Sequence, residues 1–582
     1  MAGTADQTER AIEVSLSAAG ATASCRWGRG ALAPGRPWTA GHLGAETTVR
    51  VLNAETEPGT WLLELEAVGL WHKDVVAEVR IELAGEEPGS SLWPRYQGFF
   101  ERRRAAPERG EFRGAGLPAG RLGDTERLSL PLAVVETRGG AFLAGIDPSF
   151  SSTITVEPSG ERPAAVVFSW TWLAVAGVHD RERRRLFVVA VEDAAQALDR
   201  WFELATPDIP KGPAWLHEIA LNNYDYLSKN GRGWFADIDA ACELIAPEDR
   251  HRAIFCLHAW YDEVGRYCYD PVRCVMDEEW IAVPHIGDEG LRARQTSTPV
   301  QRSMFPSPGN YVLRNLDCYS PVEMSWDEVR NRLRYAKEHG FRVAVYCLTG
   351  MESRGERQAK IADGTGLETD AWLWTGPDLI APVYVRNPLH PDVRREVVQY
   401  VEALLDKVGD LADALVMDEG YYVGIGALGP PACPGYADRA QLELVRELAA
   451  ACHRRRPELA FMTADVLGMT WLENQAFAYS LYADGIYQDS HCWPQAWDCA
   501  RFPAWRNVVW SCNWAPVSNL QWTRWGVLAH GAPVALGHGC FGDDIGLAEM
   551  DPDTRAEIAD LWRLRLTRNL APRLPIAEAE SG

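Results

Sequence analysis

The stretch ADALVMDEGYY, residues 412–422, places a short apolar run directly before two acids and a pair of tyrosines. Residues 412–417 have the composition of a strand buried in a parallel sheet. An amphipathic helix is expected before this strand, over residues 391–408, because apolar residues recur every three or four positions behind Pro391. A second helix is expected after it, over 436–453. A strand between two helices favours an α/β fold.

The same alternation of strand and helix extends over the chain beyond residue 250. Apolar runs suited to strands and periodic stretches suited to helices follow one another at the spacing of β-α units. Strands are expected at 254–260, 341–348, 412–417, 459–463, 480–487, 507–511 and 532–536, and helices at 326–338, 391–408, 436–453 and 553–568. Seven or eight such units over residues 246–582 predict a (β/α)₈ barrel of the TIM type.

The chain before the barrel has a different pattern. Residues 1–190 carry short alternating segments broken by Gly and Pro, which predict a β-sandwich, with a hairpin turn at 137–140. The charged cluster 181–185 is expected to be a solvated turn. Residues 191–245 read as a helical linker. The predicted fold is therefore multidomain, an N-terminal β-sandwich followed by a (β/α)₈ barrel, as 582 residues exceed one ordinary core.

Charge and cysteine usage restrict the partners and the compartment. The formal net charge of −23 disfavours nucleic acid and anionic membranes as partners. The N-terminus has no apolar signal core, and the longest apolar stretch, 164–178, is too short to span a bilayer. The 13 cysteines include no C-x-x-C pair, so buried thiols in a reducing compartment are expected. We expect a cytoplasmic protein, and whether it forms a homo-oligomer stays open.

The acids at strand ends point to the chemistry. Active sites of (β/α)₈ barrels lie at the carboxyl ends of the strands, and Asp418 follows a buried strand there. A carboxylate at such a place is costly unless it has a partner or a function. Cleavage of a glycosidic bond needs two carboxyl groups. We expect Asp418 to be the nucleophile and Asp489 the general acid/base, with Asp484 and then Asp543 as alternatives for the second role.

The chain is rich in tryptophan, with 24 residues of that type. Aromatic faces stack on sugar rings, while polar neighbours bind the hydroxyls; some of these tryptophans are expected to fill the core instead. The residues expected to bind substrate are aromatic, acidic or histidine side chains near strand ends. They are Trp260, Asp262, Tyr346, Glu419, Tyr421, Asp484, His491, Trp493, Trp514 and Asp543.

The predicted architecture resembles a known group of enzymes. A β-sandwich ahead of a barrel, with one Asp ending strand four and another ending strand six, is similar to the retaining α-glycosidases of the α-galactosidase (melibiase) clan and to the family 31 α-glucosidases. Val416 stands where the melibiase pattern has a lysine, and the family 31 motif around the nucleophile is absent. The resemblance implies a glycoside hydrolase that cleaves an α-linked oligosaccharide or glycoside without a cofactor or metal.

Two other functions are compatible with the sequence. His258, His285, His491 and His538 could join Asp262 and Asp418 as ligands in a metal-dependent barrel hydrolase or sugar isomerase, although no H-x-H or H-E-x-x-H spacing occurs. A non-catalytic carbohydrate-binding protein is the other alternative, and the crowding of acids at strand ends argues against it. The sugar, the linkage and the choice between retention and inversion stay open.

Overall fold

A computed structural model shows how the chain folds. It describes residues 10–16, 21–29, 48–57, 60–68, 75–82, 89–94, 100–103, 108–112, 126–128, 130–137, 140–147, 152–157, 165–172, 181–205, 212–226, 233–258, 269–270, 275–276, 281–282, 323–324, 326–348, 351–353, 372–377, 382–386, 391–418, 434–464, 482–489, 508–512, 524, 527–528, 533–537, 547–567 and 576–578. The chain divides into two compact units: Met1–Ile209 with Pro431–Leu442 and Arg573–Gly582, and Pro210–Pro430 with Glu443–Pro572.

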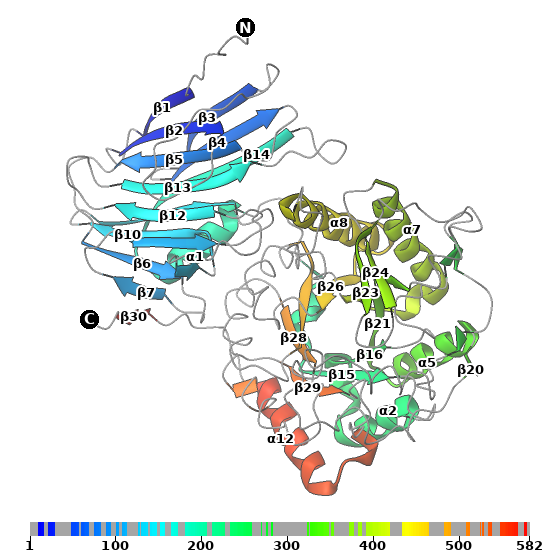
Figure 1. The fold of residues 1–582 in the computed structure, drawn as a ribbon. Coiled ribbons are helices and arrows are strands. Elements are labelled where there is room, and N and C mark those ends of the chain that lie inside the picture. The colour runs from blue at the N-terminus through cyan, green and yellow to red at the C-terminus, as the bar shows by residue number, and fades with distance from the viewer. Residues whose placement is uncertain are drawn as a thin grey trace. The chain divides into compact units, whose positions relative to one another are not determined.

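The first unit contains two β-sheets (Figure 1). One has the order β1 (Arg10–Leu16), β2 (Ala21–Arg29), β5 (Val75–Glu82), β13 (Ala165–Trp172), β12 (Ser152–Glu157), β8 (Glu108–Phe112), β9 (Glu126–Leu128). The other has the order β3 (Thr48–Glu57), β4 (Thr60–Val68), β14 (Arg181–Val191), β11 (Gly140–Ile146), β10 (Leu132–Thr137), β6 (Ser90–Pro94), β7 (Phe100–Arg103), β30 (Ile576–Glu578). Neighbouring strands are antiparallel except in the pairs β8–β9 and β7–β30. The predicted β-rich region is therefore present.

Two local predictions in this unit have different outcomes. The hairpin is confirmed, since β10 and β11 pair antiparallel with Thr137 opposite Gly140. The predicted turn at 181–185 is wrong, because these residues begin β14 and pair with β4. The register sets Arg183 opposite Glu66 and Arg185 opposite Glu64. The charged cluster therefore lies within a paired strand and not in a turn.

Helix α1 (Ala194–Ala205) packs on the second sheet of this unit. The Asp193 carboxylate caps its N-terminus by accepting a hydrogen bond from the backbone N–H of Gln196 at 2.8 Å. The fully buried Trp201 donates its indole N–H to the carbonyl oxygen of Ile146 at 3.1 Å. A Cβ at Gly145 would lie 2.7 Å from the Trp201 ring, so glycine makes this close approach possible.

The second unit is built on one eight-stranded sheet. Its order is β28 (Val508–Cys512), β27 (Gly485–Asp489), β26 (Ala460–Ala464), β25 (Ala414–Asp418), β21 (Arg342–Leu348), β16 (Ala253–His258), β15 (Leu221–Tyr226), β29 (Val534–Gly537). Every pair in this order is parallel. The two ends of the sheet, β28 and β29, also lie close to each other. In chain order these are strands one to eight, counted from β15.

In the part of the chain that the structure describes, five longer helices and several short elements accompany this sheet. The helices are α2 (Gly233–Leu244), α5 (Trp326–Glu338), α7 (Pro391–Val408), α8 (Pro434–Arg455) and α12 (Pro552–Thr567), and the 3₁₀ turns are η1 (Ala214–Glu218), η2 (Pro247–Arg252), η6 (Gly409–Leu411) and η10 (Leu547–Glu549). Small sheets pair β17 (Tyr269–Asp270) with β18 (Val275–Met276), β19 (Ile281–Ala282) with β20 (Glu323–Met324), and β24 (Pro382–Arg386) with β22 (Met351–Ser353) and β23 (Trp372–Pro377). Of the described helices, none is both long enough and apolar enough to cross a membrane.

The structure divides the predicted linker, residues 191–245, between the two units. Helix α1 belongs to the first unit, whereas β15 and α2 belong to the second. Strand β15 has the sequence LNNYDY, which lacks the apolar run by which the other strands are recognised. It nevertheless pairs with a strand on each side, β16 and β29. The run at 254–260, expected to be the first strand, is therefore the second.

Helices cover one face of the parallel sheet. The Phe255 ring of β16 packs against Trp234 of α2 and against Phe341, with ring centroids 6.0 and 5.0 Å apart. The Trp234 indole N–H donates to the carbonyl oxygen of Arg332 in α5 at 2.8 Å. Side chains alternate between the two faces of a strand. Positions an odd number of residues from Phe255 therefore belong to the opposite face.

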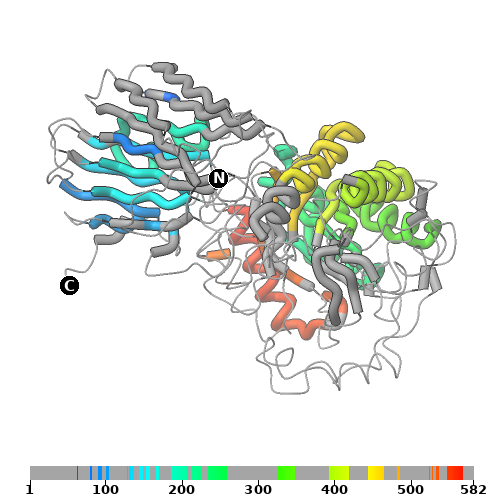
Figure 2. The backbone as a smooth tube through the Cα atoms, turned by 45° about the horizontal axis from the view of Figure 1, so that its top comes forward, coloured from blue at the N-terminus to red at the C-terminus, as the bar shows by residue number. Residues whose placement is uncertain are grey.

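Helices α7 and α8 lie side by side (Figure 2). Three acids spaced four residues apart at the end of α7 and in η6 meet three consecutive arginines at the end of α8. The pairs are Glu402 with Arg454 at 3.4 Å, Asp406 with Arg455, and Asp410 with Arg456 at 3.8 Å. The three acids are about half exposed or more, so each pair adds little free energy. Their regular spacing instead favours one alignment of the two helices.

Candidate active site at the carboxyl ends of the strands

The register of the sheet places Asp418 and Asp489 on the same face. Tyr346 pairs with Val416, Val416 with Met462, and Met462 with Gly485, and paired positions of neighbouring strands share a face. Asp418 follows Val416 by two residues and Asp489 follows Gly485 by four, so both keep that face. Each Asp is also the last residue of its strand, β25 or β27. They are therefore positions of one face at the carboxyl end of the sheet.

The face that carries Asp418 and Asp489 is opposite to the one under the helices. Cys256 pairs with Ala344, which shares a face with Tyr346 and therefore with Asp418. Cys256 is adjacent in sequence to Phe255, whose ring packs on α2. Cys347 follows Tyr346 and therefore belongs to the face opposite Asp418. It lies near the Cys452 thiol of α8, whose pKa is raised well above its usual value, mainly by burial and further by Cys347. Asp418 and Asp489 thus belong to the face of the sheet opposite the one that packs on α2.

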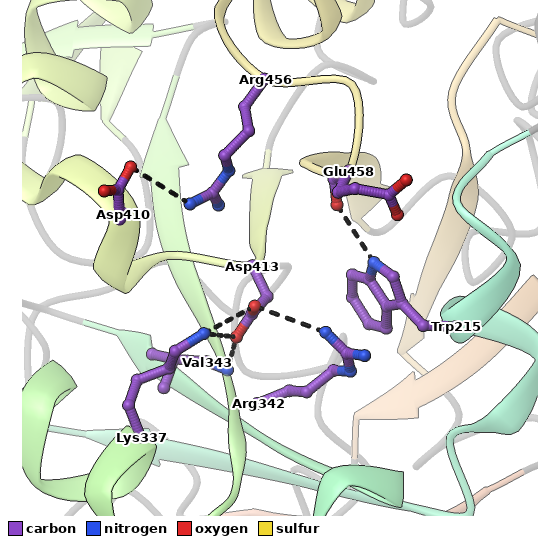
Figure 3. A network of polar contacts seen from close by, with 8 residues as sticks. All are labelled: Trp215, Lys337, Arg342, Val343, Asp410, Asp413, Arg456 and Glu458. Carbon is purple, nitrogen blue, oxygen red and sulfur yellow. Dashed lines mark hydrogen bonds and ion pairs between the residues drawn. The ribbon is translucent and has the colours of Figure 1, made fainter.

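The amino ends of strands four and six are fixed by two other aspartates. Before β25, the Asp413 carboxylate accepts hydrogen bonds from the backbone N–H of Val343 at 2.8 Å and from the Lys337 ammonium at 2.8 and 3.0 Å (Figure 3). Arg342 lies 3.5 Å from the same carboxylate, and its guanidinium stacks on Trp215, 4.4 Å from the ring centroid. Asp413 thereby ties α5, β21 and β25 together.

Asp484 has the equivalent place before β27. Its buried carboxylate accepts a hydrogen bond from the backbone N–H of Phe461 at 2.7 Å and lies 2.8 Å from Nε2 of His453 in α8. A Cβ at Gly212 would lie 2.7 Å from the Asp484 Cβ, so the chain passes close to this carboxyl. Asp484 was expected to bind substrate, but it lies at the amino end of its strand and has structural partners. We therefore leave it out of the proposed site.

Each anchoring aspartate, Asp413 or Asp484, precedes the aspartate that ends its strand by the same number of residues. Asp418 follows Asp413 by five residues (418 − 413 = 5), and Asp489 follows Asp484 by five (489 − 484 = 5). Each anchor binds the first part of the neighbouring strand, through the N–H of Val343 or of Phe461. In strands four and six, the final aspartate therefore follows a similarly anchored aspartate at the same distance along the chain.

Replacing Asp413 by Ala is expected to destabilise the second unit by about 2–4 kcal/mol, because the substitution leaves a buried N–H and two cations without their common partner. Asp410→Ala is the matched control: that side chain is fully exposed and lies 3.8 Å from Arg456, so its loss should change little. Thermal melts of the two variants measure the difference. Equal melting temperatures would contradict the anchoring role of Asp413.

The pair of His453 and Asp484 predicts a dependence of stability on pH. The hydrogen bond to Asp484 raises the pKa of His453, although burial opposes it. A raised pKa means that the stabilisation is complete below the unfolded value of about 6.5 and is lost as pH rises through the folded value. The melting temperature of wild type should therefore exceed that of His453→Gln more at pH 6 than at pH 9. His251→Gln removes an exposed imidazole and is the control for the substitution itself.

The other predicted site residues are mostly beyond what the structure describes. Tyr346 is described: it is buried in β21 and shares the face of Asp418. The residues that lie outside the described part are Trp260, Asp262, Glu419, Tyr421, His491, Trp493, Trp514 and Asp543, together with His285 and His538 of the metal alternative. Within the described part of the chain, no three acids, histidines or cysteines are grouped as a metal site would need.

Several other positions of this face lie at the carboxyl ends of strands, and among them the sequence indicated only His258, as a possible metal ligand. Tyr226 ends β15 opposite His258, which ends β16. Tyr487 and Trp510 pair with each other two residues before the ends of β27 and β28. Gly537 ends β29 opposite Tyr224. Asn222, Tyr224 and Tyr226 recur at every second position, as residues on one face of a strand do. This pattern could have predicted β15 only if polar residues were accepted in a buried strand.

Comparison with known structures shows which class of protein has this fold. The α-galactosidase from Lactobacillus brevis matches with a TM-score of 0.50 and 10% sequence identity, covering 96% of this chain and 70% of that one. The GH36 α-galactosidase AgaB from Geobacillus stearothermophilus matches with a TM-score of 0.51 and 11% identity, covering 97% and 74%. No family model and no curated protein sequence matches. The expected resemblance to the α-galactosidase clan is confirmed as a likeness of fold.

Proposed function

We propose that the chain is a retaining glycoside hydrolase that cleaves an α-linked glycoside, with Asp418 as nucleophile and Asp489 as general acid/base. The observation that carries the proposal is the register, by which the two aspartates end strands four and six at inner positions. The proposed fold is a β-sandwich followed by a closed (β/α)₈ barrel, supported by the two β-sheets, the all-parallel sheet and the closeness of β28 to β29. The substrate class is an oligosaccharide or glycoside.

The separation of the two carboxyls decides between retention and inversion. One strand, β26, separates β25 from β27, and Asp489 lies two residues beyond Tyr487, the position in register with Asp418. With strands about 4.8 Å apart and residues about 3.3 Å apart along a strand, the two Cα atoms are roughly 10–12 Å apart, and side chains extended toward the barrel axis bring the carboxyls closer. Retaining glycosidases hold their carboxyls about 5–5.5 Å apart, and inverting ones about 6.5–9.5 Å apart.

The two carboxyls would work in two steps. Asp418, ionised, attacks the anomeric carbon, while Asp489, protonated, gives its proton to the departing oxygen. Water then enters on the side of Asp489, which takes its proton as the water oxygen bonds to the anomeric carbon and the bond to Asp418 breaks. Asp489 must be protonated in the first step, and a second carboxylate nearby favours that state. Two substitutions of the same anomeric centre retain its configuration.

A panel of aryl α- and β-glycosides tests this function. We expect release of the aryl group from an α-glycoside, unchanged by a chelator, and a first-formed sugar of the α-configuration by NMR. The α-galactoside is the first substrate to try, because the structures of similar fold are α-galactosidases. Activity that depends on an added divalent metal would favour the metal-dependent alternative. Sugar binding without turnover would favour the carbohydrate-binding alternative.

A further inference from the structure

One sheet of the first unit is completed by a strand from a distant part of the chain. Strand β30 pairs in parallel with β7, so that residue Ile576 stands in register with Phe100 and Glu578 with Arg102 (Figure 1). It belongs to the segment Arg573–Gly582, which joins the first unit although the preceding residues, Glu443–Pro572, belong to the second. Among the described strands, β30 is the one that pairs with the outer edge of β7.

Strand β7 is held in place by contacts that do not involve β30. Its other edge pairs antiparallel with β6, whose five residues are all buried. The Phe100 side chain is fully buried, and two guanidinium groups form ion pairs within the unit, Arg102 with Glu136 and Arg103 with Glu101, each at 3.2 Å. Loss of β30 would therefore leave a formed strand edge with open backbone groups, which an added strand can bind.

Strand β30 is short, with three residues. It pairs with β7 through few backbone hydrogen bonds, and each such bond contributes little net free energy. A free peptide of this sequence would also lose translational freedom on binding, so its Kd should be on the order of 1 mM. Within the chain, the covalent connection supplies an effective concentration of about that value or more. We expect β30 to be paired most of the time and to open without unfolding of the unit.

We propose that the outer edge of β7 is a binding site for an extended peptide strand, and that residues 573–582 occupy it as a detachable clasp. The ligand is recognised mainly through its main chain, as in other cases of strand addition to a sheet edge. In the intact chain the occupant is β30, and the site accepts the same sequence supplied as a separate peptide. This inference does not depend on the proposed hydrolase function.

Replacing both Ile576 and Ala577 by proline tests the clasp in the full chain. Successive residues of a strand direct their backbone N–H groups to opposite sides, so one of the two prolines removes a hydrogen bond to β7. The N–H groups of residues 100–103 that face outward should then exchange with solvent about 10- to 100-fold faster, measured by mass spectrometry. Glu580→Pro with Ser581→Pro changes the same segment outside β30 and should exchange like wild type.

The peptide RLPIAEAESG, which is residues 573–582, supplies the missing strand to the double-proline variant. At about 5 mM, above the expected Kd, it should restore slow exchange at residues 100–103, whereas RLPPPEAESG should not. Restored protection supports the inference. Equal exchange in wild type and variant overturns it, as does a peptide without effect. Faster exchange throughout the first unit also overturns it, because β30 would then be an integral part of the unit.

Discussion

Asp418→Asn should abolish hydrolysis of the α-glycoside substrate while leaving the fold intact. An amide has the shape of a carboxylate but is a much weaker nucleophile, so the first chemical step fails. The expected loss of kcat is on the order of 10⁴-fold or more, as for other covalent nucleophiles. Steady-state kinetics on an activated aryl α-glycoside measure it, since such a substrate leaves formation of the glycosyl-enzyme as the step under test.

Two further measurements separate a nucleophile from a residue that only supports the site. Asp418→Ala with added azide should form a glycosyl azide of inverted configuration, because azide occupies the space of the lost carboxylate. Asp410 is exposed and lies in η6, just before β25, so Asp410→Asn should keep wild-type kinetics and melting temperature. Near-normal activity of Asp418→Asn would show that the acid ending strand four is not the nucleophile.

Asp489→Ala should impair hydrolysis in a way that depends on the leaving group. A poor leaving group needs a proton as its bond breaks, so we expect a loss of about 10²–10⁴-fold in kcat/KM for such substrates. An activated aryl glycoside needs little protonation and should lose far less. Azide should restore turnover of the activated substrate and give a glycosyl azide of retained configuration, because it replaces water on the side of Asp489.

Asp484→Ala is the matched control for this experiment. It removes a carboxyl from the same strand region, but from the amino end, where the carboxylate binds the N–H of Phe461 and pairs with His453. It should lower the melting temperature and affect good and poor leaving groups alike. Equal losses on both substrate types for Asp489→Ala would reject this residue as the proton donor, and Asp543 would then be the acid to test.

Sequence patterns predicted the strongly periodic elements well. The expected helices at 326–338 and 391–408 coincide with α5 and α7, since both have a wide apolar stripe and clear end signals: Gly340 has a φ of +91° just after α5, and Pro391 begins α7. Strand β15 could not be found in this way, because its stability comes from neighbouring strands on both sides rather than from an apolar run. Tertiary pairing likewise turned the charged cluster 181–185 into a strand.

The candidate site likewise has features that local sequence patterns predicted and features that depend on tertiary pairing. That Asp418 and Asp489 end strands could be predicted, because an apolar run precedes each. That they share a face required the register across β26, which no local pattern contains. The role of Asp484 also depended on partners distant in sequence, the N–H of Phe461 and the ring of His453.

The five-residue interval between each anchoring aspartate and its strand-end aspartate makes the proposed chemistry sensitive to chain length. Asp413 and Asp484 hold the beginnings of β25 and β27 against their neighbours. Because side chains alternate in direction, one residue inserted between anchor and end would turn the final carboxyl toward the helices, whereas two would return it to the inner face about 7 Å further along. The length of these strands can therefore change only in steps of two if the final aspartate is to keep its face.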